Sequence, residues 1–165
     1  MKLSDLADAP LTYPDVGATA ATMPPGYRQV RASRRIGTGR TRFEQAAEAV
    51  MRYGMLRGAG LTVWATTEVA APGAEVLGRL GPFSAPCRVI YVIDEPDRRG
   101  FAYGSLPGHA VQGEEMFSVR YDPADDAVYA EVAAFSRPAT GWSRLGAPVL
   151  ALSQKAVTAR YLRAV

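Results

Sequence analysis

The amino-acid sequence predicts an α+β protein: a curved antiparallel sheet of about six or seven strands packed on a long C-terminal helix, with one further helix after the first strand. Two observations lead to this fold class. From Leu61 onward, apolar strand-like segments follow one another through short, hairpin-like connections, whereas a parallel sheet needs long crossovers. After Gly141 the apolar residues return to helical spacing, and a helix of this kind can cover the apolar face of such a sheet.

The N-terminal part of the chain predicts an irregular arm followed by a strand. Residues 1–26 contain Tyr13-Pro14, Gly17 and the run Met23-Pro24-Pro25-Gly26, which are typical of turns and loops. Tyr27–Ile36 alternates loosely between apolar and arginine residues before a Gly-Thr-Gly turn, and is expected to be the first strand.

One helix is expected over Arg42–Arg57. Thr41 and Glu44 have the spacing of a capping box, in which both side chains bond to free backbone N–H groups. Gly58 and Gly60 are expected to end the helix. Its apolar stripe consists of Phe43, Ala46, Ala47, Val50, Met51 and Met55.

The remaining elements follow from turn residues and periodicity. Cys87–Asp94 is the most apolar of the strands and is therefore expected near the centre of the sheet. Pro138 is expected to end the last strand. The expected strands are Leu61–Val69, Glu75–Leu80, Cys87–Asp94, Phe101–Leu106, Glu115–Tyr121 and Val128–Ser136. The apolar face of the C-terminal helix consists of Leu145, Val149, Leu152, Ala156 and Ala159.

Composition restricts the classes of function. The chain has 165 residues, 48% of them hydrophobic, which fits a single domain over 1–165. A single cysteine and a single histidine exclude an internal disulfide, a cysteine zinc cluster and a multi-histidine site, so we expect neither a metal site nor a cofactor. No apolar run approaches the roughly 18 residues of a membrane span. The N-terminus does not resemble a secretory or transit signal, and with one free cysteine this predicts a cytoplasmic protein.

Several motifs resemble one sequence family. They are Leu11–Thr19, Ile36–Gly39, Gly100–His109, Gly113–Phe117 and Phe135–Pro138. These stretches resemble the bacterial and plant family known as DUF1990, a domain of unknown function, over nearly the whole chain. The family has Pro-Glu after the histidine, where this chain has Ala110-Val111. The resemblance implies no catalytic residue, because the family has no assigned activity.

The order of elements is similar to the helix-grip fold of the START and pollen-allergen superfamily. That similarity implies a cavity between the sheet and the C-terminal helix that holds an apolar or amphipathic small molecule. The alternative is a core filled by side chains. Because unrelated functions occur on one fold, the similarity in topology does not identify the ligand.

Polar groups that could contact such a ligand concentrate on the strands and in one loop. The segment from Tyr103 to Glu115 contains His109, whose imidazole titrates near neutral pH. Neighbouring strand residues face opposite sides of a sheet, so we expect one of Glu114 and Glu115 in the cavity and the other in water. The candidate ligand-binding residues are Tyr91, Tyr103, His109, Glu114, Glu115, Tyr129 and Arg137. Tyr91 and Tyr103 flank a hairpin, and cross-strand contact between them is one expectation.

Three functions remain open at this point. The first is binding of a hydrophobic or amphipathic small molecule. The second is an enzyme of the cyclase or hydrolase kind that uses His109 and Glu114 as an acid–base pair. The third is a structural or interaction module whose arginine-rich strand, Arg28–Arg40, binds an acidic partner. Nucleic-acid binding is not favoured, because no aromatic residues are interleaved with these arginines. The sequence predicts no oligomeric state.

Overall fold

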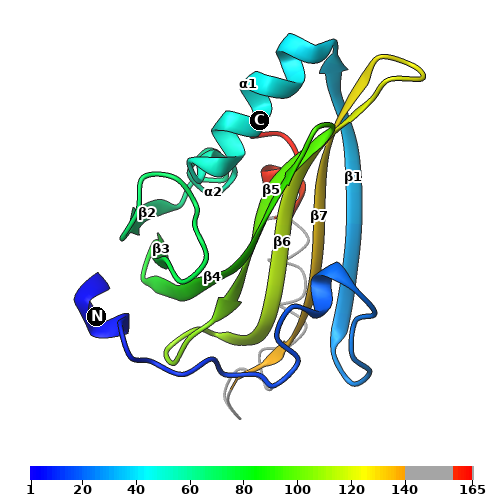
Figure 1. Cartoon of the computed structure of the whole chain (residues 1–165). Coiled ribbons are helices and arrows are strands. Elements are labelled where there is room, and N and C mark those ends of the chain that lie inside the picture. The colour runs from blue at the N-terminus through cyan, green and yellow to red at the C-terminus, as the bar shows by residue number, and fades with distance from the viewer. Residues whose placement is uncertain (140–157, 165) are drawn as a thin grey trace.

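The computed structural model describes residues 1–139 and 158–164, and it confirms the antiparallel sheet (Figure 1). Seven strands are arranged in the order β1-β7-β6-β5-β4-β3-β2, with every neighbouring pair antiparallel. Only β1 pairs with a strand distant in sequence, whereas all other pairs are hairpin neighbours. The strands are β1 Arg28–Thr38, β2 Thr62–Ala65, β3 Glu75–Leu80, β4 Phe83–Glu95, β5 Arg98–Ser105, β6 Val111–Asp122 and β7 Ala127–Pro138.

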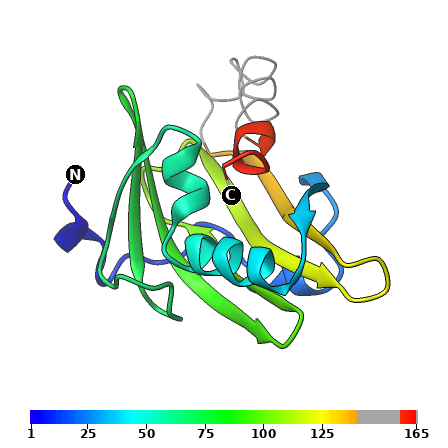
Figure 2. The same cartoon turned by 90° about the horizontal axis from the view of Figure 1, so that it is seen from above.

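The sheet has two covered faces. The helices α1 (Arg40–Met51) and α2 (Gly54–Gly58) and a helical turn at 158–161 lie on one side, which we call the helix-facing side (Figure 2). The N-terminal arm, residues 1–27, crosses the other side, which we call the arm-facing side. The arm contains two short 3-10 turns, η1 (Leu3–Leu6) and η2 (Ala18–Ala20), and is otherwise irregular.

Each side has its own apolar cluster. The larger cluster joins α1 and α2 to the helix-facing residues of the sheet, including Phe101, Phe117 and Val132, which are at most 1% exposed. The smaller cluster joins Tyr13 and Met23 of the arm to the sheet residues that alternate with the helix-facing ones and therefore face the arm. The alternation of side chains along β5, β6 and β7 therefore determines which residues lie on which side.

The predicted helix is interrupted and its predicted cap is wrong. The residue before α1 is Gly39, with φ 88°, and no side chain bonds to the free N–H groups there. The chain leaves α1 at Tyr53, whose φ of 60° is left-handed, and α2 then starts at Gly54. A Cβ atom on Gly54 would lie 2.5 Å from the backbone oxygen of Ala49, so only glycine fits this reversal.

The strands agree with the predicted set, with shifts at their ends. Glu75–Leu80 is correct in both bounds, and β7 ends at Pro138 as expected. β2 is shorter than predicted, and β4 is an inner strand but not the middle one. At the C-terminus, the turn at 158–161 is helical, whereas most of the predicted long helix lies outside the described residues and is not confirmed. Within the described part of the chain, no helix is long and apolar enough to cross a membrane.

Candidate functional site

The two adjacent glutamates of β6 face opposite sides of the sheet. Glu114 pairs with Phe135 of β7, whose ring belongs to the arm-facing cluster. Glu115 pairs with Ala134 and contacts Tyr103, which belongs to the helix-facing cluster. The expected separation of the pair is confirmed, but neither glutamate is left in water: Glu114 is only 2% exposed.

Glu114 fastens the N-terminal arm to the sheet. Its Oε2 accepts hydrogen bonds from the Tyr13 hydroxyl at 2.7 Å and from the Gly17 N–H at 2.7 Å. Its Oε1 accepts one from the Thr19 N–H at 3.0 Å and a further one from the Thr19 hydroxyl. A buried carboxylate without such partners would be costly, so the four hydrogen bonds make the arm and Glu114 depend on each other.

Local sequence explains why the arm can surround this carboxylate. Gly17 has a φ of 85°, a left-handed conformation that turns its own N–H and that of Thr19 towards the same anion. Gly104 of β5 leaves space for the Tyr13 ring, because a Cβ atom there would lie 2.2 Å from the Tyr13 hydroxyl. Burial and the adjacent Glu114 carboxylate raise the pKa of Tyr13, which therefore stays protonated and donates its hydrogen bond.

Tyr91 belongs to the same arm-facing side. Its hydroxyl is 2.7 Å from the Thr19 hydroxyl, and its ring packs on the arm-facing cluster. The β4–β5 register shifts between Val89 and Tyr91, so Tyr91 pairs with Ala102 while Val89 pairs with Tyr103. Tyr91 and Tyr103 consequently face opposite sides of the sheet, and the expected contact between them is wrong.

A second polar group lies on the helix-facing side, where it is surrounded by apolar residues. The Tyr103 hydroxyl donates to Oε2 of Glu115 at 3.2 Å, and Tyr103 is also hydrogen-bonded to Tyr161 of the C-terminal turn. Burial raises the pKa of Glu115 to about 7, an effect that the Tyr103 hydrogen bond partly offsets. Glu115 keeps some accessible surface although protein atoms enclose its carboxyl group. We call Tyr103, Glu115 and Tyr161 the helix-side triad.

Aromatic rings and a thiol surround this triad. The Tyr103 and Phe117 rings meet edge to face at 5.2 Å, and the Phe117 and Tyr161 rings do so at 5.0 Å. The buried Cys87 lies close enough to Glu115 for the carboxylate to raise the pKa of the thiol, in addition to the larger effect of burial. A thiol with a raised pKa is a poor nucleophile, so Cys87 acts here as a small apolar side chain of the core.

His109 lies in the β5–β6 loop and is not paired with Glu114. Its Nδ1 accepts a hydrogen bond from the Val111 N–H at 3.1 Å, and burial lowers its pKa to about 4. Both carboxylate oxygens of Glu114 are already bonded to the arm. The structure thus does not bring together the acid–base pair that the enzymatic alternative requires.

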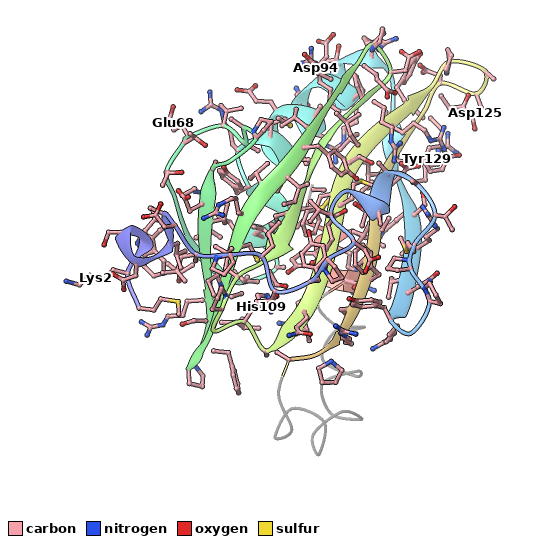
Figure 3. The ribbon with its side chains drawn as sticks, turned by 60° about the horizontal axis from the view of Figure 1, so that its bottom comes forward. Lys2, Glu68, Asp94, His109, Asp125 and Tyr129 are labelled. Carbon is pink, nitrogen blue, oxygen red and sulfur yellow. The ribbon has the colours of Figure 1, made fainter. Side chains whose placement is uncertain are left out.

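The last two sequence candidates also lie away from the triad. Arg137 stacks over the Tyr27 ring at 4.6 Å and donates to Gln112 at 3.2 Å. Tyr129 lies under the Arg120 guanidinium at 4.7 Å, near the β6–β7 turn. Figure 3 shows Tyr129 and His109 towards opposite ends of the sheet. Of the seven candidates, only Tyr103 and Glu115 are brought together on the helix-facing side.

Sequence reasoning missed Tyr161 as a site residue. The predicted stripe of the C-terminal helix contained small and aliphatic residues, and Tyr161 is outside it. Its burial, at 5% exposure, depends on contacts with Phe117 and Tyr103 from two distant strands. The sequence does show, through the alternation along β6, that Glu115 and Phe117 face the same side of the sheet. It does not show that Tyr161 packs on this side.

The structure also contains two grooves lined by described residues. One of about 570 Å³ lies between α1 and β4, with Phe43, Met51 and Val92 among its lining. The other, of about 340 Å³, is on the arm-facing side between Thr19, Tyr91 and Arg98. Neither is the cavity expected between the sheet and the C-terminal helix, whose helical wall lies largely outside the described residues. In the described part of the chain, no group of three or more metal-ligating side chains is present.

The arginine-rich segment is divided between two elements. Arg31, Arg34 and Arg35 are exposed on β1, which is an edge strand, and Arg40 lies in the first turn of α1. Charged side chains on an edge strand oppose sheet-to-sheet aggregation. Arg40 is paired with Asp97 at 2.6 Å. Binding of an acidic partner by this segment stays a prediction.

Comparisons with known proteins agree with the resemblance seen in the sequence. A UPF0548 protein of Deinococcus radiodurans is 46% identical over 76 residues, which are 46% of this chain and 38% of that protein. A UPF0548 protein of Arabidopsis thaliana is 32% identical over 133 residues, which are 73% of this chain and 62% of that protein. The matches thus span less than two thirds of either relative.

Solved structures show the fold at low sequence identity. A hypothetical protein from Helicobacter pylori has a TM-score of 0.58 at 8% identity. The match covers 84% of this chain and 89% of the Helicobacter pylori chain. Norcoclaurine synthase from Thalictrum flavum has a TM-score of 0.53 at 11% identity, and the match covers 93% of this chain and 92% of the synthase. The family described as Domain of unknown function (DUF1990) matches residues 12–164, and the chain therefore belongs to that family.

Proposed function

We propose that the protein binds an apolar or amphipathic small molecule on the helix-facing side, with the helix-side triad as its polar contact. The observation that carries the proposal is the Glu115 carboxyl group: it is enclosed by protein atoms, and among the described residues Tyr103 is its one hydrogen-bond partner. Enclosing an ionisable group in such surroundings costs stability, and perturbed groups of this kind concentrate at functional sites.

The surroundings of the triad fit an amphipathic ligand. Val89 and Val132 are helix-facing and almost fully buried, whereas Ala134, directly opposite Glu115, is partly exposed. Ala134 offers apolar surface to the body of a ligand, with the two valines packed on the same side of the sheet, and Glu115 and Tyr103 supply polar groups beside it. Ligand sites generally combine an apolar lining with a few convergent polar groups in this way.

The two sides of the sheet divide structural and binding roles. On the arm-facing side the polar groups of Glu114 and Tyr91 are used within the protein, because they bond to the arm. On the helix-facing side, Glu115 retains accessible surface. Glu114 and Tyr91 are thus committed to the arm, whereas Glu115 has one hydrogen-bond partner among the described residues.

A space-filling substitution tests the proposal. Titration with N-phenyl-1-naphthylamine, an uncharged dye that fluoresces in apolar sites, should give a saturable rise in fluorescence. Ala134→Trp places an indole beside Glu115 and should weaken dye binding by about tenfold or more, equivalent to about 1.4 kcal/mol.

The matched control is Ala124→Trp, in the exposed β6–β7 turn. It introduces the same side chain far from the triad and should leave dye binding unchanged. Circular dichroism of both variants verifies that the sheet is intact. Dye binding that is absent from the unmodified protein, or equal in the two variants, would contradict the proposal.

A further inference from the structure

The charge at the helix-side triad is not balanced by a cation from the described part of the chain. Glu131, on the arm-facing side, is bonded to Arg98 at 3.2 Å and to Arg120 at 3.0 Å. Glu75 is likewise paired with Arg88 at 3.4 Å. By contrast, no arginine, lysine or histidine within residues 1–139 and 158–164 forms an ion pair with Glu115.

The groups that face Glu115 come from several elements and none of the described ones is basic. Tyr103 comes from β5, Cys87 from β4, Tyr161 from the C-terminal turn and Ala134 from β7. When Glu115 is ionised, its neighbours within residues 1–139 and 158–164 offer hydroxyl groups, aromatic rings and a thiol, but no positive charge. A positively charged ligand would supply such a charge, and an opposite charge nearby favours the ionised form of a carboxyl group.

The aromatic residues around the triad favour the same ligand chemistry. The Tyr103 hydroxyl contacts the carboxyl group, and the Phe117 ring packs edge to face with the rings of Tyr103 and Tyr161 at centroid distances of 5.2 and 5.0 Å. The faces of aromatic rings attract cations, and an ammonium group next to both rings and a carboxylate gains from each. An anionic ligand would meet repulsion from the same carboxylate.

We propose that the ligand is an amphipathic amine, with its protonated amino group against Glu115 and the two tyrosine hydroxyls and its apolar body along the helix-facing side of β6 and β7. This inference rests on the function proposed above and adds the chemical class of the ligand. It assigns Glu115 the role of recognising charge, and Tyr103 the role of positioning the carboxylate through their hydrogen bond.

Three probes with the same body and different head groups test the inference: octylamine, octanol and octanoate, measured by calorimetry at about pH 8. Glu115 is then ionised and octylamine is protonated. The amine should bind at least about tenfold more tightly than the alcohol, and octanoate should bind most weakly. Lowering the pH to about 6 protonates Glu115 and should reduce the advantage of the amine.

Glu115→Gln keeps the shape of the side chain and should remove the preference for amine while alcohol binding remains. Glu68→Gln, which removes a charge at a largely exposed position, is the control and should change nothing. Equal binding of amine and alcohol, or tightest binding of octanoate, would overturn the amine inference but leave small-molecule binding in place. Failure of all three probes to bind would overturn the inference and also count against the proposed function.

Discussion

At the scale of single residues, Glu114 and Glu115 are neighbours with unrelated roles. The sequence predicted that they face opposite sides of the sheet, because strand residues alternate. It did not predict that Glu114 is buried by the arm, because this depends on Gly17 and Tyr13, about a hundred positions away. It also could not identify Tyr161, whose packing depends on contacts between distant parts of the chain.

Replacing Glu114 by Gln should destabilise the protein by about 2–4 kcal/mol. The amide retains the size of the side chain, but in either orientation its NH₂ group faces the N–H of Gly17 or that of Thr19, which cannot accept a hydrogen bond. Urea unfolding measures the loss, and hydrogen exchange at these two amides should accelerate. A variant with unchanged stability and unchanged exchange would show that the carboxylate does not hold the arm.

Glu115 and His109 should give opposite slopes to the pH dependence of stability. The pKa of Glu115 is raised from 4.5 to about 7 in the folded protein. Its contribution to folding stability is therefore fully present below about pH 4.5 and is lost as the pH rises to about 7. The pKa of His109 is lowered from 6.5 to about 4, so its contribution is present above about pH 6.5 and is lost as the pH falls to about 4. The two effects largely cancel between about pH 4.5 and 6.5.

Glu115→Gln should remove one of these slopes. The stability of the unmodified protein relative to this variant should fall by up to about 3 kcal/mol between about pH 4.5 and 7. Urea unfolding of both proteins across this range measures the difference directly. A difference that does not change with pH, or that grows as the pH rises, would show that Glu115 does not have the raised pKa.

At the scale of elements, the periodicity of the sequence was a good guide to strands and a poorer guide to helix ends. β3 and the end of β7 were predicted correctly because turn residues and Pro138 delimit them. The predicted helix is divided because Tyr53 adopts a left-handed conformation, which apolar spacing does not reveal. The capping box at Thr41 is absent because the helix already starts at Arg40, after Gly39.

The seating of the arm on β5 should depend on Gly104. A Cβ atom at this position would overlap the Tyr13 hydroxyl, so Gly104→Ala should displace Tyr13 from Glu114. We expect a loss of about 2–3 kcal/mol in unfolding free energy and faster proteolysis within the arm. Gly81→Ala, at a turn glycine with free space around it, shows the separate cost of a left-handed φ. Equal arm protection in the Gly104 variant and the unmodified protein would contradict the proposed packing.

At the scale of the whole molecule, the sheet separates the side that the N-terminal arm covers from the side on which we propose that a ligand binds (Figure 2). The predicted antiparallel sheet and the family resemblance are both confirmed. The extent of the C-terminal helix and the cavity behind it stay predictions. The candidate residues chosen from the sequence lie on both sides of the sheet. The sequence could not show the register shift near Tyr91, which puts this tyrosine on the arm-facing side.

The central claim is that a small molecule binds on the helix-facing side, and methyl NMR tests it most directly. Val132 and Ala133 are adjacent on β7, but Val132 is helix-facing and Ala133 is arm-facing. On addition of N-phenyl-1-naphthylamine, ring-current shifts should appear at the methyl groups of Val132 and Ala134. The methyl groups of Ala133 and Met116 should stay unchanged. Larger shifts at Ala133 and Met116, or no shifts on either side at saturating dye, would contradict the claim.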